Sequence, residues 1–538
     1  MISGAEQRLL LDHDIPLHPI PASAASFRIA LLPACVSLLI YLLCLPASLP
    51  GGMAGDLVAA VVVPEVTSGG SSLWRWPAAL LTELLPFQTT VWKLSFFSAL
   101  ATAVSVAVFT VWLLQQDVAR RAAIAAGLFL AFGNAIWSSA TVPSVLPLFL
   151  LLTTITLVLF YQWLSTREDR WLFLAALATG LGSFQHPFFS VPGALLMVGA
   201  VMRLARTRAQ LHSWVALPVG LLLGLLPFAW AGSGWVGASG SVLVHRPDSF
   251  LLQRIAVDLG FEHYWIGVPF FFATLVIAMR RARRPLLPLF VLLIAPIITA
   301  AAFFDRVPAV AADGTPLQLA APALIALAAF IGRALDLLLR RTRMLQPIQV
   351  NLVGALTACL PLVLLIGHFH SHDLSRYKYV EEMATQLVSQ LPEDALLVTT
   401  LDYRGAAVRH ALLVEAQRPD VTLLDRQYPD TWPSDRPIFA TAPTPQRKLR
   451  TWTPVGLAYL SIAADEPTPT RHASAARFTD LPADPLDYRP KTGAPLDATA
   501  RHIASRYYAE RVRDLVNAGR REDADRVEAA ARTLTESP

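Results

Sequence analysis

The feature that most constrains this chain is a series of long apolar runs separated by short arginine-rich segments. A helix needs about 20 apolar residues to cross the hydrocarbon core of a bilayer. The runs that reach about this length are Ile29–Leu49, Thr90–Leu114, Ala122–Ala140, Val142–Leu164, Trp214–Ala231, Pro285–Phe304, Leu317–Leu339 and Val350–His368. Three shorter runs lie among them, at Trp171–Phe184, Phe188–Met202 and Tyr264–Met279. We therefore predict a mainly α membrane protein with about eleven transmembrane helices.

Two of these runs need a separate interpretation. Trp171–Phe184 and Phe188–Met202 are joined only by Gln185-His186-Pro187, which favours a tight hairpin of two spans over a re-entrant pair. The first run is too long for the core of a signal peptide, and no small-residue cleavage site follows it, so we interpret it as a retained anchor.

Arginine clusters predict the orientation of the spans, because cytoplasmic loops carry an excess of basic residues. The clusters occupy every second connection: Arg120 and Arg121, Arg167 and Arg170, Arg203–Arg208, Arg280–Arg284 and Arg340–Arg343. This alternation predicts a cytoplasmic N-terminal tail (1–28) and a membrane domain (29–369), with everything after it on the periplasmic or extracellular side. The outer side then also receives the long first loop (50–88) and the connections 232–263 and 305–316.

Composition supports this division and excludes some functions. Only 15% of the residues are charged, whereas soluble domains have about a quarter. The net charge of +5 comes largely from the loop clusters, so it indicates membrane orientation and no nucleic-acid partner. The three cysteines lie in apolar runs and imply neither a disulfide framework nor a metal framework. Lysine makes up only four of the 44 basic residues and alanine is abundant, as in GC-rich bacterial genomes, so we expect a bacterial inner (plasma) membrane.

The segment 370–496 is predicted to form an outer α/β domain. Ala395–Thr400 and Val421–Asp425 have the pattern of strands, and Gly405–Gln417 between them has that of a helix. Asp402 would follow the first strand, where α/β sheets commonly bind ligands. A capping or turn-forming role for this acid is the alternative.

The last segment, 497–538, is predicted to form a tetratricopeptide-like helical hairpin that breaks at Gly519. Because one such unit cannot bury its own apolar face, we expect it to dock on its neighbour. The first loop is half apolar, which predicts short helices in the membrane interface with Trp74 and Trp76 at headgroup level. Near the inner end of the tenth span, Arg333 and Asp336 are interpreted as structural.

Several motifs together resemble a bacterial family of multi-spanning proteins related to the membrane protein O-mannosyltransferases of the GT-C glycosyltransferase superfamily. They are Gly55-Asp56-Leu57-Val58-Ala59-Ala60, Phe132-Gly133-Asn134 with Trp137-Ser138, Gly182-Ser183-Phe184-Gln185-His186, Arg418-Pro419-Asp420-Val421 and Pro454-Val455-Gly456-Leu457. The resemblance rests on their order and spacing over most of the chain.

The resemblance implies transfer of a sugar from a polyprenyl-phosphate carrier to a protein or glycan acceptor on the outer face. An acceptor hydroxyl needs a carboxylate to take its proton, and Asp56 is the candidate base. The leaving lipid phosphate needs cations, hydrogen-bond donors or a divalent metal. His186, Arg246, Arg254 and Asp402 are the candidate substrate-binding residues.

Each of these residues also has a structural interpretation. Asp56 could cap the apolar stretch that follows it, and His186 could satisfy helix-end carbonyls. Arg246 and Arg254 have the alternative of being solvated loop charges.

The chain departs from the family pattern at three places. Met53 stands where the family has its first acid, Ser144 stands where a Glu is expected, and a His-Pro-Pro-Gly motif is absent. Glu65 is a second candidate acid by proximity alone. These losses leave open a catalytically degenerate relative that binds a lipid-linked glycan or serves as an envelope assembly subunit. A transporter ranks last, because the spans carry almost no charges at mid-membrane depth.

Overall fold

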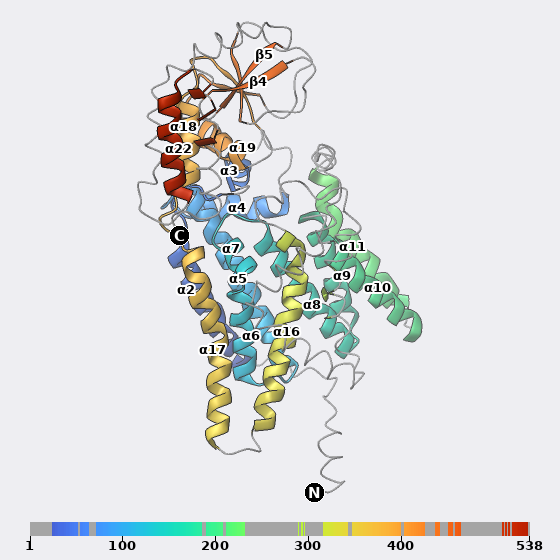
Figure 1. Ribbon diagram of the computed structural model, residues 1–538. Coiled ribbons are helices and arrows are strands. Elements are labelled where there is room, and N and C mark those ends of the chain that lie inside the picture. The colour runs from blue at the N-terminus through green and yellow to red at the C-terminus, as the bar shows by residue number, and fades with distance from the viewer. Residues whose placement is uncertain are drawn as a thin grey trace, which may run out of the picture.

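The computed structural model describes most of the chain. The described residues are 24–51, 54–63, 72–185, 190–207, 211–231, 316–342, 347–399, 403–424, 436–441, 450–455, 458–463 and 519–535, with single helical residues within 289–295 and 508–516. Figure 1 shows a helical bundle in the lower part of the view and the C-terminal α/β elements above one end of it.

Apolar helices in the bundle match the predicted runs. Within the described residues, four helices are long and apolar enough to cross a membrane, and one bent pair makes a fifth. The four are α2 (Ala24–Cys44), α5 (Thr90–Gln115), α8 (Leu146–Thr166) and α16 (Pro316–Thr342), and the bent pair is α6 (Arg120–Ala131) with α7 (Asn134–Ala140). Further predicted runs coincide with α9 (Asp169–Gln185), α10 (Ser190–Thr207), α11 (Leu211–Ala231) and α17 (Pro347–His372). Tyr264–Met279 and most of Pro285–Phe304 lie outside the described residues, so the total of eleven stays a prediction.

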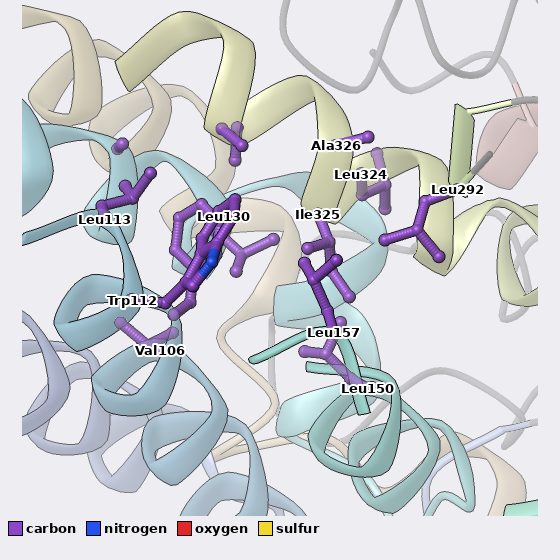
Figure 2. Close-up of a cluster of buried hydrophobic side chains, with 14 of the residues drawn as sticks. Val106, Trp112, Leu113, Leu130, Leu150, Leu157, Leu292, Leu324, Ile325 and Ala326 are labelled. Atoms are coloured by element: carbon purple, nitrogen blue, oxygen red, sulfur yellow. The ribbon is translucent and has the colours of Figure 1, made fainter. Parts of the chain in front are cut away.

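The bundle core is apolar and is built by facing helices. Figure 2 shows side chains from α5 (Val106, Trp112, Leu113), α6 (Leu130), α8 (Leu150, Leu157) and α16 (Leu324, Ile325, Ala326) in one buried cluster. α5 also buries hydroxyl groups in this interior. The hydroxyls of Thr102, Ser105 and Thr110 donate to carbonyls four residues earlier, at 3.0, 2.7 and 2.7 Å. Because these donors are satisfied within the helix, the face that carries them can be buried without water.

Helices α9 and α11 approach each other closely through glycines. A Cβ atom on Gly180 would lie 2.6 Å from the Leu221 carbonyl oxygen, and one on Gly224 would lie 2.3 Å from that of Leu177. Small residues that let two backbones meet are the usual means of helix association in a membrane, where lipid is as apolar as the side chains. The predicted hairpin of α9 and α10 is joined by residues 186–189, which lie outside the described residues.

The third predicted span, Ala122–Ala140, is broken rather than continuous. α6 and α7 meet at an angle of 65° around Phe132-Gly133. The carbonyls at this break are engaged by two other helices: Tyr41 Oη donates to the Ala131 oxygen at 2.7 Å, and His368 Nδ1 lies 2.9 Å from the Phe132 oxygen. A helix can break at membrane depth only where such partners satisfy its freed backbone groups.

At the end of α6 away from the break, charged residues connect α16 with the segment that joins α5 to α6. Asp336 of α16 accepts from the backbone N–H of Ala119 at 2.9 Å and pairs with Arg340 at 2.9 Å. Arg340 also pairs with Asp117 at 2.9 Å. Arg333 contacts the Gln116 side chain at 3.5 Å. Asp336 therefore satisfies the backbone N–H of Ala119, the N-cap residue of α6, which agrees with a structural role.

The C-terminal elements form a five-stranded sheet of order β2-β1-β3-β5-β4. Its strands are β1 (Leu396–Val398), β2 (Thr422–Leu424), β3 (Ile438–Ala440), β4 (Arg450–Val455) and β5 (Ala458–Ala463). β1 is parallel to β2 and β3, whereas β5 is antiparallel to β3 and β4. The connection from β1 to β2 is helical, as the strand–helix–strand pattern predicts: α19 (Tyr403–Arg409) continues into a π-helical turn, η4 (His410–Val414).

Two helices complete this region. α18 (Tyr379–Ser389) precedes β1, and α22 (Arg521–Thr535) follows Gly519, whose φ of 74° ends the preceding helical turn. Tyr508, Leu515, Ala524 and Val527 are buried in the same cluster as the α18 side chains. The C-terminal helix therefore docks on its neighbour, as its apolar face requires.

One apolar core joins the first loop to the C-terminal elements. The loop contains α3 (Ala54–Val62) and α4 (Ser72–Leu84). Val58, Trp74 and Ala78 from these helices are buried in one cluster with residues of α18 and α19. Trp74 is 1% exposed and packs edge-on against Phe97, so its prediction as a residue of the membrane interface is wrong. Trp76, two residues on, is 54% exposed and lies on the opposite face of α4.

Candidate functional site

The candidate base, Asp56, lies in the first turn of α3, where the first loop meets the C-terminal region. α3 packs directly on α19. At Gly55 the two backbones almost touch, because a Cβ atom there would lie 2.2 Å from the Ala406 carbonyl oxygen. No larger residue fits at Gly55 unless α3 and α19 separate. The sequence Gly-Asp thus brings the acid to the surface of α19.

Asp56 forms a two-point ion pair with Arg409. The Nε and Nη2 atoms of Arg409 lie 2.5 and 2.8 Å from the two carboxylate oxygens of Asp56. The Arg409 side chain is only 4% exposed and that of Asp56 only 15% exposed. The third nitrogen, Nη1, donates to Thr399 Oγ1 at 2.7 Å. Arginine presents its donors as a planar fork, so this arrangement fixes the orientation of the carboxylate as well as its position.

Thr399, which holds Arg409 on its other side, lies at the carboxyl edge of the parallel strands. Thr399 directly follows β1, and Arg409 is the last residue of α19 before the π-helical turn. At the same edge, Arg404 is 2% exposed and donates to the carbonyl of Thr441, which follows β3. This edge is where open α/β sheets commonly bind ligands, and single π-helical turns are frequent at functional sites. Asp402, predicted at this edge, lies outside the described residues.

A carboxylate held in this way can still accept a proton. An ionised carboxylate has two oxygens with about four lone-pair positions in total. Two of these positions accept from the guanidinium. The arrangement is therefore compatible with a base that is oriented by its partner, and equally with a structural ion pair.

Next to Arg409, His410 is buried and close to an acid without forming an ion pair with it. Burial lowers the pKa of His410 to about 4, so the imidazole is neutral at neutral pH. Its Nδ1 atom lies 3.7 Å from Glu415 Oε1, which is too long for a hydrogen bond. Burial, and then the charge of Glu381, raises the pKa of Glu415.

The Arg418-Pro419-Asp420 motif has a structural function. Arg418 donates to the carbonyls of Leu391 and Pro392 just beyond α18, at 2.9 and 3.2 Å. It also pairs with Asp420 at 2.5 Å, which lowers the pKa of that carboxyl to about 2. The motif therefore joins the end of α18 to the start of β2.

The remaining candidate residues are distributed as follows. Met53, Glu65, His186, Arg246 and Arg254 lie outside the described residues. Ser144 is buried, and its backbone N–H donates to Ser98 Oγ at 3.2 Å, so it links the start of α8 to α5. Among the residues that the structure describes, no group of three His, Cys, Asp or Glu side chains is arranged to hold a metal ion.

Comparison with known proteins identifies the architecture. Two crystal structures of ArnT from Cupriavidus metallidurans align over 78% of this chain and 93% of theirs, at 15% identity. The TM-score is 0.51 for the structure bound to undecaprenyl phosphate and 0.52 for the apo state. The chain has an ArnT-like fold. This likeness shows the fold alone, and membership of the GT-C superfamily stays a prediction from the sequence motifs.

The sequence comparisons add no closer assignment. No family model matches the chain, and no curated protein matches it. The relation to the O-mannosyltransferases therefore stays a prediction.

Proposed function

We propose that this protein is a GT-C glycosyltransferase that moves a sugar from a polyprenyl-phosphate carrier to a protein or glycan acceptor. The observation that carries the proposal is the ArnT-like fold, which extends over most of both chains, together with the undecaprenyl phosphate bound to ArnT. The substrates themselves are proposed by analogy, from the family resemblance and from the fold.

The chemistry assigns a role to each candidate residue. An acceptor hydroxyl attacks the anomeric carbon, its proton passes to a carboxylate, and the bond to the lipid phosphate breaks. Asp56 is the proposed base, and Glu65 is the second acid of the same loop. His186, Arg246, Arg254 and Asp402 are proposed to bind the donor phosphate or the sugar, with a divalent metal as an alternative source of positive charge.

The proposed location follows from the arginine alternation. The N-terminal tail lies in the cytoplasm, and the C-terminal α/β region and the first loop lie on the periplasmic side of a bacterial inner membrane. A polyprenyl-linked donor would then present its sugar at the level of α3 and α4.

The test is sugar transfer from a polyprenyl-phosphate donor in membranes that contain the wild type, Asp56→Asn or Glu65→Gln. Asparagine keeps the size of the side chain but cannot take the proton, so we expect Asp56→Asn to lower kcat about 100- to 10,000-fold. Donor binding by the folded protein should stay near the wild-type level, whereas stability should fall because the buried Arg409 loses its charged partner. Glu65→Gln tests whether Glu65, the second candidate acid of the loop, is the base in place of Asp56. Wild-type transfer that Asp56→Asn leaves intact would refute the role of base.

A catalytically degenerate relative is the second candidate. One observation favours it: both oxygens of Asp56 are engaged by Arg409, as in a structural ion pair. Such a protein would bind a lipid-linked glycan or serve as an envelope assembly subunit. Measurable binding of the donor by the wild type without transfer of any common sugar would support this candidate.

A further inference from the structure

Asp56 and Arg409 are separated by 353 positions in the sequence, yet they form one of the most buried ion pairs in the described part of the chain. A charge that loses its hydration needs a well-oriented partner, and a pair this far from water is costly unless the geometry is good. Here the fork of the guanidinium meets both carboxylate oxygens. The pair therefore fixes the relation between the first loop and the C-terminal region.

Arg409 is itself held in place on its other side. Thr399 accepts from Nη1 at the end of β1, and α19 is packed between α3 and α18. The contact of Gly55 with the Ala406 carbonyl sets the distance between the two backbones one turn away from the ion pair. The guanidinium thus has little freedom to move without a shift of the whole helix.

We propose that Arg409 is a positioning residue that orients the Asp56 carboxylate for proton transfer, so that the site is completed by the C-terminal region of the same chain. This inference rests on the proposed function. It adds that the membrane domain alone is not a competent enzyme, because the orientation of its base comes from a helix and a strand end located some 350 residues away.

The experiment measures kcat and KM for a polyprenyl-phosphate sugar with full-length protein carrying Arg409→Lys. Lysine keeps the charge but has a single nitrogen in place of the fork, so it cannot hold both oxygens and Thr399 together. Misplacement of a reacting group by about 1 Å costs on the order of 100-fold in rate. We expect kcat to fall about 100-fold and KM for the donor to stay within about twofold, since Arg409 acts on the base and not on the donor.

Arg418→Lys is the matched control. It makes the same substitution in the same region and also breaks a two-point pair with a carboxylate, that of Asp420. It lowers stability but should leave kcat of the folded protein near the wild-type value. The double variant Asp56→Glu with Arg409→Lys remakes an ion pair with the carboxylate displaced by one methylene. It should recover thermal stability while kcat stays low.

Each outcome decides between the interpretations. Wild-type kcat in folded Arg409→Lys, or full recovery of kcat in the double variant, would show that the pair is only structural. If Arg409→Lys does not fold, Thr399→Val replaces it: loss of the hydroxyl that holds Nη1 should lower kcat, and an unchanged kcat would overturn the inference. Absence of transfer by the wild type would instead refute the proposed function, and the inference with it.

Discussion

His410 illustrates how one buried residue makes the stability of the protein depend on pH. The side chain is 5% exposed and packs in the π-helical turn directly after Arg409. In the folded protein its pKa is lowered by burial to about 4, against an ordinary value of 6.5. At pH values between 4 and 6.5, His410 is protonated in the unfolded chain but neutral in the folded chain. Folding is therefore favoured above pH 6.5, and this contribution is lost as the pH falls toward 4.

We expect the purified protein to become less stable as the pH falls from about 6.5 to 4. His410 should lower the free energy of unfolding by about 3 kcal/mol over this range. Glu415 acts in the opposite direction at pH values just above its ordinary pKa of 4.5. Burial raises its pKa in the folded protein, so there the folded chain binds a proton that the unfolded chain has lost, and acid stabilises the fold. The measurement is the melting temperature in detergent at several pH values for the wild type and His410→Gln. The variant should show a flatter dependence on pH. Parallel curves for the two proteins would contradict the assignment.

At this same scale, the sequence could identify the type of residue in the candidate site but not its partners. Asp56 stands out because an acid at the start of an apolar stretch in the first loop resembles a family motif. Arg409 and Thr399 carry no such signal, since a helical arginine and a strand-end threonine are ordinary features of α/β regions. Their importance depends on a tertiary contact with a residue some 350 positions away, which local patterns do not encode.

At the scale of elements, the break between α6 and α7 depends on side chains from two other helices. Hydropathy predicts one continuous span there, because both halves are apolar, although Gly133-Asn134 between them is a pair typical of turns. The interruption is stable because Tyr41 of α2 and His368 of α17 reach the carbonyls at the end of α6. Apolar periodicity therefore locates helices well, whereas their breaks depend on polar contacts between helices.

Removal of one of these contacts should destabilise the bundle. Tyr41 is fully buried, and Tyr41→Phe leaves the Ala131 carbonyl without this donor. We expect a loss of about 1–3 kcal/mol in unfolding free energy, measured by denaturant titration in detergent. Tyr161→Phe is the matched control, because its buried hydroxyl has no hydrogen-bond partner within the described residues. That variant should be neutral or slightly stabilising, and equal losses in both would refute the explanation.

At the scale of the whole molecule, the membrane bundle and the C-terminal region are joined by more than their covalent connection. The backbone N–H of Leu374 donates to the Cys44 carbonyl at 3.1 Å, and that of Leu49 donates to Glu381 at 3.0 Å. The Ser48 hydroxyl also donates to the Tyr377 carbonyl. Together with the Asp56–Arg409 pair, these contacts fix the C-terminal region on the end of α2 and on the first loop. The end of the last apolar run near residue 370 indicates where the membrane domain ends, but not that the two parts share a core.

This shared core predicts that residues 371–538 are only marginally stable when expressed alone. The cluster around α18 and α19 also contains Val58, Trp74 and Ala78 from the first loop. Without them, apolar side chains of α18 and α19 are exposed to water at a cost of about 25 cal/mol per Å². We expect the fragment to be soluble and to unfold below the range of about 45–65 °C that is usual for mesophilic domains. Thermal unfolding monitored by circular dichroism measures this midpoint. Fusion of residues 54–84 through a flexible linker should raise the midpoint, because α3 and α4 then complete the core. A fragment that unfolds cooperatively well above that range, with no gain from the fusion, would show that the C-terminal region has a sufficient core of its own.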